Sequence, residues 1–135
     1  MNPVIVSSVA ALGILVAVLG AWVTTVRVRT GVMYHGERMP PTSQMAKAVR
    51  AHGNAAEYAG MLMALYLVTG LVYGAAPLEN WVAAMIVGVT VVRYLGAIGF
   101  LTCQTLEKIH PLKALAAIST YGGTLALAIN VLLKL

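Results

Sequence analysis

The chain has 135 residues and carries 9 basic and 4 acidic side chains, for a formal net charge of +5. Soluble domains have about one-quarter charged residues, so a charged share of 10% and a mean hydropathy of +0.86 exclude a water-soluble globular domain. The length fits one domain, residues 1–135. A single cysteine, Cys103, excludes an internal disulfide and a cysteine-only metal cluster.

Four apolar spans follow one another along the chain. The first, Val4–Val26, contains no charged residue. At about 1.5 Å per residue it reaches roughly 34 Å, enough to cross a hydrocarbon core of about 30 Å. We expect it to remain in the protein, because no basic residue precedes it and it is longer than the apolar region of a signal peptide.

The second span starts near Ser43 and is apolar over Ala55–Tyr73, the third covers Pro77–Leu101, and the fourth covers Pro111–Leu133. Strand-like alternation is missing, and helices satisfy their own backbone hydrogen bonds in lipid. The sequence therefore predicts an all-α membrane protein, a bundle of four transmembrane helices.

The connections differ in character. Thr30–Thr42 is polar and is interrupted by Gly36 and the Pro40–Pro41 pair, which predicts a true loop. Gly74–Ala76 is short enough for a tight turn. Thr102–His110 is polar, and we expect it to continue the third helix beyond the membrane.

Basic residues gather around the first and third connections, which the positive-inside rule places in the cytoplasm. They are Arg27, Arg29, Arg38, Lys47, Arg50, Lys108 and Lys113. Both termini are then outside the cytoplasm. The same distribution argues against a nucleic-acid partner, and the Ala-, Gly- and Val-rich composition favours a multi-pass protein of a bacterial inner membrane.

Arg50, Asn54 and Glu57 form a polar row where the second span begins, because residues at i, i+4 and i+7 share one helix face. Ionisable residues at membrane depth cost about 2.5–3.5 kcal/mol each and tend to mark function. Two interpretations remain open: Arg50 and Glu57 partner each other or neighbouring helices, or the row binds a ligand. Its groups suit a zwitterionic, amide-bearing molecule with carboxylates. One carboxylate and no histidine on this face are too few for a metal site.

The stretch "RAHGNAAEY", Arg50 to Tyr58, resembles the MAPEG family, the membrane-associated proteins in eicosanoid and glutathione metabolism. The similarity to microsomal glutathione transferases of bacterial type extends over the chain. It implies a homotrimer that binds glutathione, as a co-substrate, between subunits on the cytoplasmic side. By position, Arg50, Asn54, Glu57 and Tyr58 would hold its peptide part. Arg27, at the end of the first helix, matches the family's basic residue there.

Arg93 and Tyr94 in the third span match an "RY" pair of leukotriene-forming members. The resemblance implies that Tyr94 contacts glutathione and that Arg93 and Tyr94 are the candidates for stabilising its thiolate. An ion pair between Arg93 and Glu57 is the alternative. The pattern then departs from the family, because Ile98 stands where a second tyrosine is expected and Thr105 where an arginine is expected.

Three functions are compatible with these residues. The first is a glutathione transferase or peroxidase for lipophilic small-molecule electrophiles, acting in detoxification. The second is a member that retains the fold without transferase chemistry, as a lipid-binding protein or a structural trimer. The third, a small proton-coupled multidrug exporter, is less favoured because the charge of Arg50 suits an ion pair with Glu57 better than a proton carrier.

Overall fold

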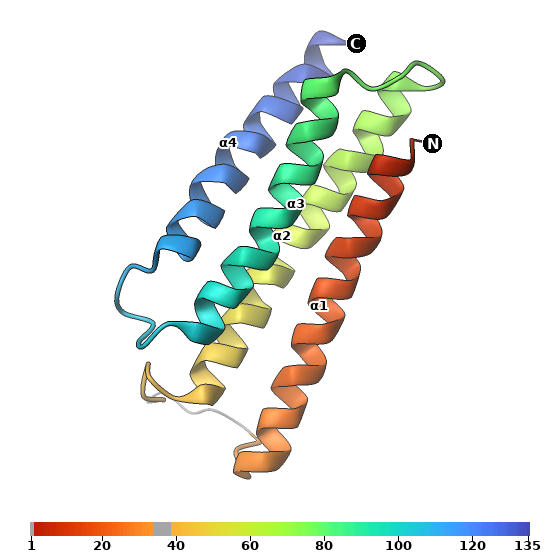
Figure 1. Cartoon of the computed structure of the whole chain (residues 1–135). Coiled ribbons are helices and arrows are strands. Elements are labelled where there is room, and N and C mark those ends of the chain that lie inside the picture. Colours follow the sequence, from red (N-terminus) through yellow and green to blue (C-terminus); the bar gives the residue numbers. More distant parts are fainter. Residues whose placement is uncertain (1, 34–38) are drawn as a thin grey trace.

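The computed structural model describes residues 2–33 and 39–135, which form four helices (Figure 1). They are α1 (Pro3–Thr30), α2 (Gln44–Tyr73), α3 (Asn80–Thr102) and α4 (Pro111–Leu133). Each is long and apolar enough to cross a membrane, and the described residues contain no strand. The predicted fold class is confirmed.

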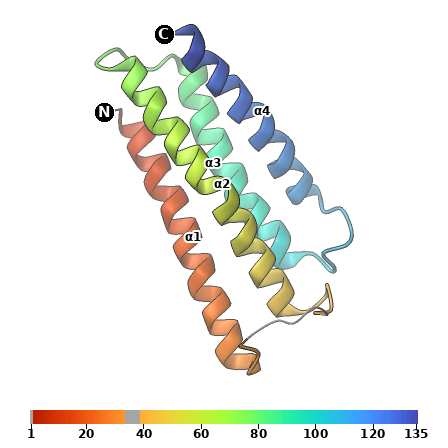
Figure 2. The same ribbon diagram turned by 180° about the vertical axis from the view of Figure 1, so that it is seen from behind.

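The helices run alternately up and down, so that both termini and the α2–α3 connection lie at one end of the bundle (Figures 1 and 2). The other two connections lie at the opposite end. α2 and α3 contact each other and both outer helices, whereas α1 and α4 do not contact each other within the described residues. The outer helices therefore expose wide apolar faces, with Ile14 and Val18 on α1 and Ile118 and Leu125 on α4, as lipid contact requires.

The close approach of α1 and α2 depends on small side chains. Ala48, Ala51, Ala55 and Ala59 recur every three or four residues on α2 and are all buried. Leu15 and Leu19 of α1 pack against the two middle alanines. Small residues at a helix interface bring backbones together where lipid offers no hydrophobic driving force. This alanine stripe turns the polar row of α2 toward α3 and α4.

The helix ends follow local chemistry. Asn2 caps α1 by accepting the Val4 N–H, and Ser43 caps α2 at the predicted start by accepting the Ala46 N–H. α1 extends past the predicted Val26 to Thr30 and ends at Gly31, whose φ of 69° suits glycine. Gly36 and Arg38 of the predicted first loop lie outside the described residues.

Two expectations for α3 are wrong. The helix begins at Asn80, after Pro77, and it ends at Thr102 instead of continuing toward His110. The following backbone finds partners outside a helix: the Leu106 N–H donates to the Pro41 carbonyl, and Lys113 donates to the carbonyls of Leu106 and Lys108. The Leu106–Pro41 bond also joins the two connections at this end of the bundle.

Glycines set the distance between α3 and α4. A Cβ at Gly96 would lie 2.7 Å from the Ala116 Cβ, and one at Gly123 would overlap the side chain of Val89. Neighbouring Gly122 has open space around the same position. The α3–α4 contact therefore depends on Gly123 but not on Gly122.

We expect Gly123→Ala to lower the free energy of unfolding by about 1–3 kcal/mol, the usual cost of overpacking a well-packed contact. Unfolding in detergent micelles, followed by circular dichroism during titration with a denaturing detergent, measures the change. Gly122→Ala is the matched control and should unfold like the wild type. Equal stability of both variants would show that α3 and α4 are not in close contact at Gly123.

Candidate functional site

Two residues of the polar row, Arg50 and Asn54, face a cleft between α2, α3 and α4, near the end of the bundle where α2 begins. Arg50, Asn54 and Tyr58 line this cleft together with Arg93 and Phe100 of α3. α4 completes the wall with Lys113, Ala116, Ala117 and Tyr121. The cavity has a volume of about 200 Å³. Three of its lining side chains are cations and none is a carboxylate, and the Glu57 carboxylate lies beside the cavity, paired with Arg50.

Arg50 and Glu57 form an ion pair on the open side of the row. The Arg50 Nη1 lies 3.1 Å from the Glu57 Oε1, and the two side chains are 49% and 54% exposed. The guanidinium also lies 5.8 Å from the centre of the Phe100 ring. One of the two interpretations is therefore observed directly, since these residues partner each other. Their exposure also leaves both charged groups accessible from outside the protomer.

Arg93 is the buried charge of the site, with only 3% of the residue exposed. Its Nη2 donates to the Asn54 carbonyl oxygen at 2.9 Å and to the Asn54 Oδ1 at 2.6 Å, and its Nη1 donates to the Thr120 Oγ1 at 3.5 Å. The guanidinium carbon lies 4.6 Å from the centre of the Tyr58 ring. Arg93 thus bonds to Asn54. The alternative ion pair between Arg93 and Glu57 is not formed.

The bond to Arg93 fixes the orientation of the Asn54 amide. Because Oδ1 accepts from the guanidinium, the amide oxygen is turned toward Arg93, and the NH₂ group is left to donate to a ligand. The sequence pattern allowed Asn54 to serve as donor or acceptor, and the structure favours the donor role. A carboxylate or carbonyl oxygen is its matching partner.

Tyr58 and Tyr121 join α2 to α4 through their hydroxyl groups, whose oxygens are 2.7 Å apart. The two rings are tilted by 58° with their centres 5.9 Å apart. Tyr121 is not among the site residues expected from the sequence. In the sequence, Tyr121 stands out only as a polar hydroxyl in the middle of the fourth apolar span. That position does not indicate which helix the hydroxyl contacts.

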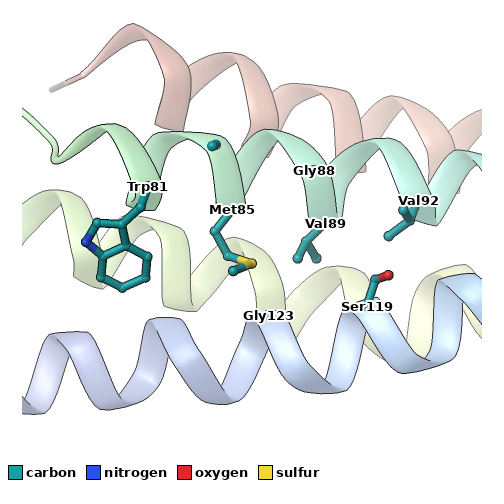
Figure 3. Close-up of a pocket in the computed structure, with 8 residues that line it drawn as sticks. Trp81, Met85, Gly88, Val89, Val92, Ser119 and Gly123 are labelled. Atoms are coloured by element: carbon teal, nitrogen blue, oxygen red, sulfur yellow. The ribbon is translucent and has the colours of Figure 1, made fainter.

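A second cavity, of about 580 Å³, lies between α3 and α4 on another part of the surface (Figure 3). Trp81, Met85, Val89 and Val92 of α3 and Ser119 of α4 line it, and it shares no lining residue with the charged cleft. No charged side chain lines this groove. Its uncharged lining suits lipid chains better than a charged molecule.

Comparison with protein families gives one match, in which the sequence model of the MAPEG family matches residues 5–133. The chain belongs to the MAPEG family. No curated protein and no solved structure gives a significant match. MAPEG membership and the four long apolar helices identify an integral, multi-pass membrane protein of glutathione- or eicosanoid-related metabolism.

Three residues expected at the site from the MAPEG resemblance, Arg27, Glu57 and Tyr94, do not line this cleft. Glu57 is held beside it by the ion pair with Arg50. The Tyr94 hydroxyl donates to the Ala11 carbonyl of α1 at 2.7 Å, because Tyr94 follows Arg93 on α3 and points about 100° away from it. Arg27 lies in the last turn of α1, partly buried. The contacts of all three with glutathione stay predictions. Ile98 is exposed, and Thr105 lies in the α3–α4 connection.

We expect Asn54→Ala to destabilise the ligand-free protein, because the substitution removes one of the few partners of a buried guanidinium. Hydrogen bonds to charged groups contribute about 1.5–3 kcal/mol, and the free energy of unfolding in micelles should fall by that amount. Arg50→Ala is the matched control and should cost about 1 kcal/mol or less, since exposed ion pairs contribute little. A larger loss for Arg50→Ala than for Asn54→Ala would contradict the conclusion that Asn54 supports the buried guanidinium while Arg50 is in an exposed ion pair.

Proposed function

We propose that this MAPEG protein binds glutathione along the polar row of α2 and joins its thiol to lipophilic electrophiles that arrive from the bilayer, as a transferase or peroxidase. The observation that carries the proposal is the charged cleft at membrane depth, in which Arg50, Arg93 and Lys113 surround a small cavity without a lining carboxylate. Charge at this depth is costly and tends to be kept for function.

The available groups match glutathione part by part. The Arg50 guanidinium can bind a carboxylate through two parallel hydrogen bonds. The Asn54 NH₂ group can donate to a peptide carbonyl, and the exposed Glu57 carboxylate can accept from an ammonium or amide group. All three lie on one face of α2 and their free atoms are directed away from the alanine stripe.

Arg93 supplies the electrostatics for the reaction. Among the described residues its hydrogen-bond partners are neutral, namely Asn54 and Thr120. The positive charge is therefore not cancelled locally, and it favours an anion in the adjoining cleft. A free thiol is mostly protonated near neutral pH, so stabilising the thiolate beside Arg93 activates glutathione for attack on an electrophilic carbon.

The site needs a second subunit. A cavity of about 200 Å³ is smaller than the range of about 300–1,000 Å³ typical of small-molecule pockets. The half-exposed Arg50–Glu57 pair also leaves one side of the row open. A homotrimer in which a neighbour's α1 covers this side, bringing its Arg27 to the ligand, would complete the wall. In the orientation expected from the positive-inside rule, both termini lie on the outer side of a bacterial inner membrane, and the cleft opens toward cytosolic glutathione.

We expect purified protein to bind glutathione in calorimetric titrations and to conjugate it to chlorodinitrobenzene. Arg50→Ala and Glu57→Gln should each weaken binding about tenfold or more, because each removes a charge-assisted hydrogen bond of about 1.5–3 kcal/mol. Arg29→Ala and Glu107→Gln are matched controls outside the cleft and should bind normally.

The result that contradicts the proposal is also specific. If millimolar glutathione produces no binding heat with the wild-type protein, the MAPEG fold serves another role here, such as a lipid-binding or structural trimer. If the wild type binds glutathione and the Arg50 and Glu57 variants bind equally well, the ligand lies elsewhere on the protein.

A further inference from the structure

The Tyr58–Tyr121 pair places two phenol hydroxyls in the charged cleft. Both residues line the cavity that also contains Arg93. Tyr94, the tyrosine expected at the site from the sequence, has its hydroxyl bonded to the backbone of α1 and does not line the cavity. The hydroxyls that share the cleft with Arg93 therefore come from α2 and α4.

The two hydroxyls together can donate a proton to a bound substrate. Two hydroxyls 2.7 Å apart use one proton for the hydrogen bond between them, so the second proton remains available to a third group. The outward hydrogen bond is strengthened by the inner one, since linked hydrogen bonds polarise one another. When Tyr121 gives its proton away, Tyr58 can pass its own proton across the hydrogen bond, and the Arg93 guanidinium, 4.6 Å from the Tyr58 ring centre, then stabilises the Tyr58 phenolate.

The position of the pair suits a substrate dissolved in lipid. Tyr121 lies ten residues after Pro111, where α4 begins, which corresponds to about 15 Å along the helix axis. This is about half of a hydrocarbon core of about 30 Å. Tyr121 is 59% exposed and lies between the exposed side chains of Ile118 and Leu125 on the same face of α4. Half of the core is the bilayer midplane, where the acyl chains of the two leaflets end, so a reactive group toward the methyl end of an acyl chain would meet the hydroxyl pair at this depth.

We propose that Tyr121, backed by Tyr58, is a catalytic proton donor to the leaving oxygen when the protein reduces hydroperoxides carried on lipid chains. The proposal rests on the glutathione-binding function proposed above. Glutathione thiolate attacks the terminal peroxide oxygen, the O–O bond breaks, and the leaving alkoxide takes the tyrosine proton to become an alcohol. The proton released when the thiolate formed returns to the phenolate. A second glutathione condenses with the resulting sulfenic acid to give the disulfide and water.

The decisive experiment compares two reactions that differ in their leaving group. Conjugation to chlorodinitrobenzene releases chloride, which needs no proton, whereas reduction of cumene hydroperoxide releases an alkoxide, which does. We expect Tyr121→Phe in detergent micelles to lower hydroperoxide reduction by about 100-fold, the lower end of the range for general acids. Conjugation by the same variant should fall much less, by about threefold or less.

The matched control is Tyr73→Phe. Tyr73 also joins α2 to α4, since its hydroxyl donates to the Asn130 Oδ1 at 3.2 Å, but it lies outside the cleft. This variant should retain both rates. Tyr58→Phe should lower hydroperoxide reduction, and in that reaction the Tyr58→Phe/Tyr121→Phe double variant should be little slower than Tyr121→Phe, because the two hydroxyls act as one unit.

Several results would overturn the proposal while leaving the glutathione function intact. They are an equal loss of both reactions in Tyr121→Phe, no loss of either, and a wild type that conjugates glutathione but does not reduce hydroperoxides. Failure of the wild type to bind glutathione in calorimetry would instead overturn the underlying function, and with it this role for Tyr121.

Discussion

The burial of Arg93 in the middle of α3 is the constraint on which the rest of the site depends. A guanidinium removed from water loses several kcal/mol of hydration, and an ion pair offsets the loss only with good geometry and additional hydrogen bonds. Here the described partners are neutral: the backbone and side chain of Asn54, the Thr120 hydroxyl and the Tyr58 ring. These groups come from α2 and α4, so satisfying one charge holds three helices in register.

This arrangement divides the polar row of α2 into an inner and an outer part. Asn54 turns inward and is bound to Arg93, whereas Arg50 and Glu57 remain about half exposed and bound to each other. The inner part is needed for the fold even without ligand, and the outer part can exchange its internal ion pair for contacts with a zwitterion. The three residues of the row are thus compatible with both of the interpretations that the sequence left open.

The number of helices, the fourth span and the start of α2 at Ser43 could be predicted because apolar length and capping residues are local properties. The end of α3 could not, since nothing in Thr102–His110 forbids a helix, and the Leu106 N–H finds its acceptor on Pro41, in a distant segment of the chain. The shared face of Arg50, Asn54 and Glu57 follows from helix periodicity.

The contacts of these side chains could not be predicted from the sequence, because they too depend on how separate helices pack. Uniformly apolar helices carry little information about which face turns inward, so the partner of Arg93 and the approach of Tyr121 depend on how α3 and α4 pack. Tyr94 illustrates the difficulty, because it adjoins Arg93 in the chain but faces α1. A family resemblance supplies positions for such residues, and the packing decides which of them line the same cavity.

The open side of the bundle would link the proposed assembly to the proposed ligand binding. α1 packs on α2 and α3 but contributes no side chain to the charged cleft of its own chain, while α4 lies on the other side without contacting α1. An exposed Arg50–Glu57 pair facing lipid would be costly. A neighbouring subunit that covers the pair removes this cost, and so does a bound zwitterion that spans the gap. Both effects act on the same charges, so glutathione bound at this interface would strengthen the association of the proposed trimer, and the trimer would strengthen binding by an equal free energy.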